Sequence, residues 1–246
     1  MTRALTVLLI LFLSFQGYTQ NDTISSQKKG FIFESSSRNM NFSSLNELLS
    51  ISGFPRIDNN VIGFSLGRTY RFSDMNSYGS GVITFLETES SNSEGDSKSA
   101  VIRMLELAAE MHWVVSKSPK WFIYPYYGFG ISASKLKLTE KITNLTFEES
   151  ISDLSANKEN SREYYSEYPL LFANLGIGID RKIKISSIDY YLGLSLGYRL
   201  STKSNWGYAG SPSINYNGFE FKLKVRFEIN NENLKHYKPK YYKYFN

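Results

Sequence analysis

The sequence predicts an all-β protein, an eight-stranded antiparallel up-and-down transmembrane β-barrel with a short helix in the first extracellular loop. Apolar and polar residues alternate with a period of two along nearly the whole chain after residue 29. The connections between the alternating segments are short and long in turn. Aromatic residues make up 15% of the chain, with 18 Tyr and 17 Phe. Together these features are typical of a barrel that meets lipid on its outer wall.

The first twenty residues form a predicted export signal. Arg3 precedes the apolar run 4–15, and residues 16–20 can hold a cleavage site. A dozen or so apolar residues are too few for a membrane-spanning helix, which needs ~20. We therefore expect a cleaved signal peptide at 1–20, a periplasmic segment at 21–29, the barrel at 30–230 and a basic, Tyr-rich periplasmic tail at 231–246.

Composition excludes several classes of protein. The chain has no cysteine, which excludes disulfides, Cys-based metal sites and the lipid-modified cysteine of a lipoprotein. Its net charge of +5 is modest, and an exported protein would rarely meet nucleic acid, so we expect no nucleic-acid partner. Mean hydropathy is negative, but only alternate residues of a barrel strand face lipid, so this average does not argue against a membrane protein.

The alternation of apolar and polar residues supports four predicted strands in the first half of the chain. The segment 30–38 is short, whereas 59–72 clearly sets apolar residues against glycine, serine and charge. The segment 78–90 is weaker. In 101–115 one face is Leu, Ala, Met and Trp, and the opposite face carries carboxylates and a histidine.

The last four predicted strands are 121–138, 169–182, 188–201 and 219–229. The final one is the clearest, because Phe, Leu, Val and Ile alternate with charged residues throughout. Nearly every predicted strand supplies the ~9–11 residues that a tilted strand needs to cross the hydrocarbon layer, and 30–38 is barely long enough.

Short and long connections alternate along the chain. The short ones are 73–77, 116–120 and 183–187, and the longer or more polar ones are 39–58, 91–97, 139–163 and 202–216. Within the first long loop, Leu45, Leu48 and Leu49 share a face of a predicted helix over 43–53 that Gly53 and Pro55 end. We expect turns in the periplasm and loops outside the cell.

The narrowness of an eight-stranded barrel decides which face meets lipid. Its interior is just wide enough to be filled by side chains, so small residues and paired charges suit the inside better than stacked Phe and Leu. A soluble barrel, with the faces exchanged, is therefore the less favoured interpretation. Aromatic residues near the turns are expected to form an interfacial girdle: Phe31, Phe72, Tyr78, Trp113, Trp121, Tyr190 and Phe227.

The candidate site is a charge network inside the barrel, and we expect no catalytic, cofactor-binding or metal residues. Glu106 and Glu110 lie about 13 Å apart along a strand, too far for the ~5–9.5 Å of a glycosidase pair. Buried carboxylates cost several kcal/mol each unless they are paired. The predicted network is Glu106, Glu110, His112, Arg199, Glu220, Lys222, Lys224 and Arg226.

Other motifs carry no chemistry on this interpretation. We expect His112 to face inward near the turns, with no serine nearby. A barrel that hydrolyses lipid would instead need its histidine and serine together on the outer wall near the cell surface. The other histidine, His236, lies in the tail, so a two-histidine metal site is disfavoured. Paired glycines such as Gly128 and Gly130 sit inside strands with no helix to follow, so they are not nucleotide loops. We expect them to make room for long charged side chains.

The tail allows two interpretations. It mixes lysines with aromatic residues, and such segments can anchor a partner protein; a solvated, disordered end is the alternative. The hypothetical partner-binding residues are Lys238, Lys240, Tyr241, Tyr242, Lys243, Tyr244 and Phe245.

The chain resembles outer-membrane β-barrel proteins of Bacteroidetes. The resemblance lies in the LNELLSISGFPR segment 45–56, the repeated x-G-x-G strands, and the glycine followed by spaced hydrophobic residues at 218–223. It implies an outer-membrane location, contact with lipid and lipopolysaccharide, and insertion by the barrel-assembly machinery, but no activity. We expect a structural or interaction role, through loops or tail, in a cell-envelope complex. The alternatives are a narrow pore for ions or small solutes and a lipid A-modifying enzyme.

Overall fold

The computed structural model describes residues 28–72, 76–90, 98–140, 160–185, 188–207 and 211–229. The predicted signal segment and tail lie outside them. The elements in order are β1 (Lys28–Asn39), α2 (Ser43–Ile51), β2 (Asn60–Phe72), β3 (Ser77–Glu89), β4 (Lys98–Trp113), β5 (Trp121–Glu140), β6 (Asn160–Tyr165), β7 (Leu170–Ile185), β8 (Ile188–Ser201) and β9 (Gly218–Ile229).

Eight of these strands close into a ring. Sheet neighbours follow the order β4-β3-β2-β1-β9-β8-β7-β5, and β4 also pairs with β5. The first strand pairs with the last, from Lys29 opposite Ile229 to Arg38 opposite Glu220. All of these pairs are antiparallel. Because the ring is closed, every ring strand has a neighbour on both sides, and the barrel has no free edge within the ring. The predicted fold class is confirmed.

The sixth strand was not predicted. β6 pairs with the far end of β5, from Lys135 opposite Tyr165 to Glu140 opposite Asn160, whereas the sequence suggested a loop at 139–163. The reason is packing: Tyr164 on β6 and Leu138 on β5 both contact an apolar cluster inside the barrel, and that contact extends the sheet beyond the ring. Residues 141–159 are outside the described part.

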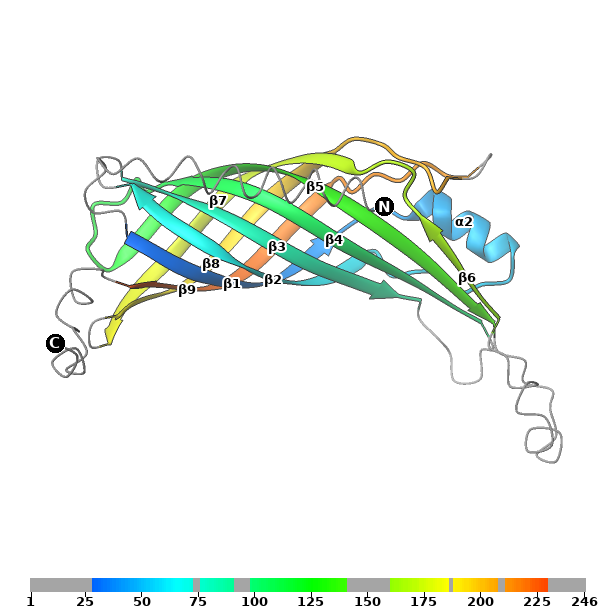
Figure 1. Ribbon diagram of the computed structural model, residues 1–246, viewed down its shortest axis with the longest axis horizontal. Coiled ribbons are helices and arrows are strands. Elements are labelled where there is room, and N and C mark those ends of the chain that lie inside the picture. The colour runs from blue at the N-terminus through cyan, green and yellow to red at the C-terminus, as the bar shows by residue number, and fades with distance from the viewer. Residues whose placement is uncertain are drawn as a thin grey trace, which may run out of the picture.

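The two ends of the barrel differ in their connections. The turn end carries the connections 73–76, 114–120 and 186–187, and the loop end carries α2, β6 and the longer connections. Figure 1 shows α2 and β6 at the same end of the tilted strands. The last turn is tighter than the predicted 183–187, because Ile185 still pairs with Ile188 and Lys182 reaches Asp189 at 2.8 Å.

The helix forms where it was predicted. α2 is followed by Gly53 at φ 73°, a left-handed conformation that favours glycine and ends the helix. Leu45 and Leu49 are buried, but Leu48 is 42% exposed. The buried face is therefore narrower than the three leucines suggested. No helix among the described residues is long and apolar enough to cross a membrane.

The polarity of the two barrel faces is the reverse of that in a water-soluble protein, where apolar side chains are inside and polar ones outside. Large apolar side chains stand outward, including Ile177 at 65% exposed and Phe219 at 63%. Charged side chains are inside, and Arg226 is 2% exposed. An apolar outer wall around a polar interior is the arrangement of a transmembrane barrel. The assignment of Tyr78 to the girdle is wrong, because this side chain points inward, opposite His112 in the β3–β4 pairing.

Candidate functional site

The barrel interior is filled in three layers. At the loop end an apolar layer joins α2, the inward residues of several strands, and three residues of the connection between β8 and β9. It consists of Met40, Phe42, Leu45, Leu49, Ile57, Val61, Leu86, Ala100, Ile102, Met104, Leu136, Leu170, Trp206, Ile214 and Tyr216. Hydrogen bonds in both directions between Asn46 and the backbone of Ile57 fix the helix segment over this layer.

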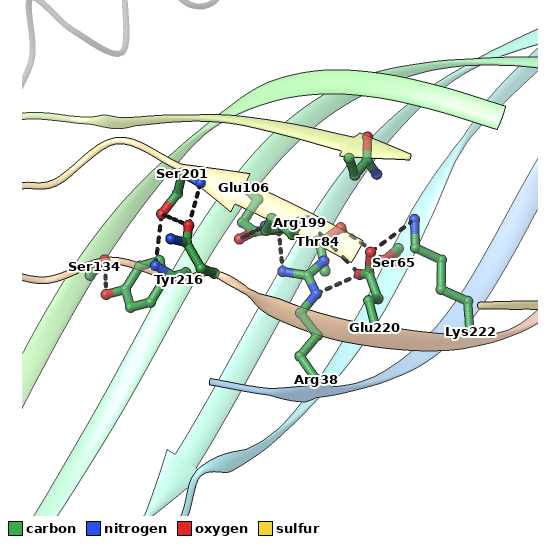
Figure 2. A network of polar contacts seen from close by, with 12 residues as sticks. Arg38, Ser65, Thr84, Glu106, Ser134, Arg199, Ser201, Tyr216, Glu220 and Lys222 are labelled. Carbon is green, nitrogen blue, oxygen red and sulfur yellow. Dashed lines mark hydrogen bonds and ion pairs between the residues drawn. The ribbon is translucent and has the colours of Figure 1, made fainter. Parts of the chain in front are cut away.

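The middle layer centres on two carboxylates that share two arginines. Arg38 Nη1 lies 2.6 Å from one oxygen of Glu106, and Arg199 Nη1 lies 2.5 Å from the other. The Nε of Arg38 donates to Glu220, which also lies 3.8 Å from Arg199. Figure 2 shows Arg38 between Glu106 and Glu220. Neighbouring strands β1 and β9 and the opposite strand β4 are thus joined through the lumen.

Lys222 extends this network toward the turn end. Its Nζ lies 2.5 Å from Glu110, 3.6 Å from Glu220 and 3.8 Å from Glu34. Asn174 Nδ2 donates to the same Glu110 oxygen at 2.8 Å. A single ammonium group therefore forms ion pairs with three carboxylates from three strands.

The third layer is aromatic and lies toward the turn end. Its buried members are Tyr78, Phe122, Tyr124, Tyr126 and Tyr191. Arg226 passes through it: the guanidinium carbon is 4.0 Å from the Tyr78 ring centroid and 3.9 Å from that of Tyr191. The same guanidinium lies 3.3 Å from Asp180 and donates to Glu228. Cation–π contacts of this kind strengthen where water is excluded.

Glycines make room for this aromatic layer. A Cβ at Gly178 would lie 2.5 Å from the Tyr124 ring, and one at Gly197 would overlap the Tyr126 hydroxyl. The sequence suggested that glycines accommodate long charged side chains. That holds for Gly128, where a Cβ would lie 2.8 Å from Cγ of Glu110, but tyrosines are the larger reason.

The buried charges are nearly matched. The fully enclosed cations are Arg38, Arg199, Lys222, Lys224 and Arg226, and the carboxylates are Glu34, Glu106, Glu110, Asp180, Glu220 and Glu228. Arg71, at the edge of the lumen, lies 3.6 Å from Glu228 and supplies a further positive charge. Pairing of this kind offsets the several kcal/mol that each buried ion would otherwise cost.

The structure places all eight predicted network residues inside the barrel. It adds four that were missed: Glu34, Arg38, Asp180 and Glu228. Each of these occupies an inward position of the period-two pattern, so the alternation could have identified them. Lys224 is the least satisfied member. It lies 4.0 Å from Glu34, and the Tyr124 and Tyr126 rings are within 5.3 Å of its Nζ.

His112 has a serine beside it, contrary to expectation. Ser80 Oγ lies 3.2 Å from His112 Nε2 because β3 and β4 pair in that register. Glu110 approaches the same nitrogen at 3.4 Å, and Nδ1 has no hydrogen-bond partner among the described residues. A Ser–His–acid relay needs serine and acid on different nitrogens. The ring instead stacks on Tyr78, with centroids 4.2 Å apart.

The part of the chain that the structure describes contains no group of three or more acidic or histidine side chains placed to hold a metal ion. His236 lies outside the described residues. The interior offers ion pairs, hydrogen bonds and aromatic packing, most of them between different barrel strands.

The closed ring and the reversed polarity define the class: a transmembrane β-barrel of the outer-membrane type. No protein-family model matches the chain, and no curated protein matches it.

Several solved barrels are similar in fold. Neisserial surface protein A is 10% identical, with 83% of this chain and 96% of that chain covered at a TM-score of 0.37. Ail, the attachment invasion locus protein of Yersinia pestis, is 12% identical, with 82% and 96% covered at 0.37. A major outer membrane protein from Thermus thermophilus is 10% identical, with 82% and 98% covered at 0.44.

Proposed function

We propose that this chain is an integral protein of the cell outer membrane with a structural or interaction role, as a component of an envelope complex of the Bacteroidetes type that its sequence resembles. The observation that carries this proposal is the filled interior. Two apolar or aromatic layers enclose a charge-matched middle layer. With the lumen occupied, the surfaces that remain for function are the loops and the chain ends.

We place the turn end in the periplasm and the loop end outside the cell. β1 begins and β9 ends at the turn end, so both chain ends leave the barrel on that side. Short periplasmic turns and longer outer loops are the usual arrangement of such barrels. The loop end is then the surface that meets the environment, and its anchored helix gives the loops a rigid base.

Co-purification with the tail removed tests the interaction role. The chain would be purified in mild detergent as the full protein and as a form truncated after Asn231, and heat-modifiable migration would confirm that both fold. We expect a periplasm-facing partner to be lost from the truncated form, because aromatic anchors each contribute ~2 kcal/mol or more to an interface. If the truncated form retains every partner, then the partners bind through the external loops and not through the tail. A full-length protein that brings no specific partner would contradict the complex.

The narrow pore is the second candidate, and conductance separates it from a closed barrel. In planar bilayers we expect no steady single-channel steps, because side chains fill the eight-stranded lumen and open aqueous channels need about sixteen strands. Defined, reproducible current steps would establish the pore instead.

For lipid A modification, unchanged lipid A mass spectra in a deletion strain are expected, since Ser80, Glu110 and His112 are enclosed in the barrel.

A further inference from the structure

Exposed cations surround the turn end of the barrel. They are Lys29, Arg68, Lys117, Lys120, Arg181 and Lys184, here called the cationic collar. Among the described residues at this end, no carboxylate is exposed: Asp180 and Glu228 are buried, and Asp189 is paired with Lys182. At the loop end, by contrast, exposed carboxylates lie beside some of the outward cations, as in Arg103–Glu87 and Lys135–Glu163, each at 2.6 Å.

Two arginines of the collar are held at the aromatic girdle. Arg68 on β2 lies over Phe31 of β1, 5.9 Å from the ring centroid, and Arg181 on β7 lies over Trp121 of β5 at 5.6 Å. Each ring is the direct cross-strand partner of its arginine. In the ring order, these two strand pairs stand on opposite sides of the barrel.

The rings set the depth at which these guanidinium groups lie. Phe31 is 41% and Trp121 is 44% exposed on the outer wall, and amphipathic aromatic residues gather at the headgroup boundary of a bilayer. A guanidinium stacked on such a ring is therefore held at the level of lipid phosphates. Its planar fork of N–H donors suits a phosphate, with which it can form two parallel hydrogen bonds.

We propose that the cationic collar binds the headgroups of anionic phospholipids in preference to zwitterionic ones. The inference rests on the barrel crossing a bilayer, and with the orientation proposed above it places the collar in the periplasmic leaflet. Charge complementarity carries it, because six exposed cations lie at the turn end with no exposed carboxylate described beside them. The attraction is local to the turn end, since the mixed charges of the loop end would not share it.

Tryptophan quenching by brominated lipids can test the preference at Arg181. The chain has three tryptophans, and Trp206 is buried at 3% exposure, so a Trp113→Phe protein leaves Trp121 as the one described tryptophan that faces lipid. In phosphatidylcholine vesicles, quenching by dibrominated phosphatidylglycerol is compared with quenching by dibrominated phosphatidylcholine. We expect a relative binding constant of about five, the effect of one surface cation, falling toward one in 1 M NaCl, where the Debye length is about 3 Å.

Variants in the same background separate charge from packing. Arg181→Gln should bring the ratio to about one, and Arg181→Lys should keep it above one. Arg103→Gln, which removes an exposed cation at the loop end, is the matched control and should leave the ratio unchanged. Equal quenching by both lipids in the parent protein, or a preference that survives Arg181→Gln, would overturn the proposal. Heat-modifiable migration of each variant shows that the barrel is folded, so the lipid preference can fail while the transmembrane barrel stands.

Discussion

Replacing Glu106 with Leu is expected to lower the free energy of unfolding by on the order of 3–5 kcal/mol. The carboxylate accepts from Arg38 and Arg199 on two other strands, at 2.6 and 2.5 Å. Both guanidinium groups are enclosed, at 3% and 2% exposure. Removing Glu106 takes the nearest carboxylate from Arg199 and leaves Arg38 with Glu220 alone. The measurement is the urea midpoint of the folded protein in detergent or lipid, followed by loss of heat-modifiable migration.

Leu105→Ala is the matched control for this substitution. Leu105 precedes Glu106 on β4 but faces outward, 36% exposed. Its truncation should change stability far less, because lipid can fill the space that a core cavity would leave empty. If Glu106→Leu keeps the parent midpoint, or if both variants lose the same stability, then the interior ion pairs do not hold the strands together as the geometry implies.

The fold was predictable because a barrel wall imposes a simple period on the sequence. On β9 the outward Phe221 and Leu223 and the inward Lys222 and Lys224 follow one another without a break. The width of an eight-stranded lumen then decides which face is inside. The eight ring strands and most of the charge network follow from these two facts, whereas the helix follows from the spacing of its own leucines.

Contacts between strands were less predictable, because register is set by the closed ring and not by any one segment. The pairing that brings Ser80 to His112 joins residues 32 positions apart, and nothing in either segment specifies it. Tyr78 was assigned to the outer girdle because the alternation of β3 is weak: Val82 and Leu86 are apolar and yet point inward together with Tyr78. The division of the inward face into layers was also missed, although β4 shows it directly: Ile102 and Met104 join the apolar layer, and Glu106 begins the charged one.

Replacing Leu49 with Asp is expected to release α2 from the loop end while the barrel stays folded. Leu49 is 3% exposed within the apolar layer, and an unpaired carboxylate there would cost several kcal/mol. The ring of strand pairs does not include α2, so undocking the helix is the cheaper response. Chymotrypsin added to whole cells should then cleave after Phe42 or Leu45, while migration of the uncleaved protein stays heat-modifiable.

Leu48→Asp provides the control, because it places the same charge one residue away, where the side chain is already 42% exposed. It should be cleaved after Phe42 or Leu45 no more than the parent protein, since a carboxylate at that position remains in water. Cleavage of Leu49→Asp only after the outer membrane is permeabilised would place the loop end in the periplasm and reverse the proposed orientation. Resistance of Leu49→Asp under both conditions would mean that α2 is held by its Asn46 hydrogen bonds and by Lys98, which lies 3.4 Å from the Ser52 carbonyl, more than by its buried leucines.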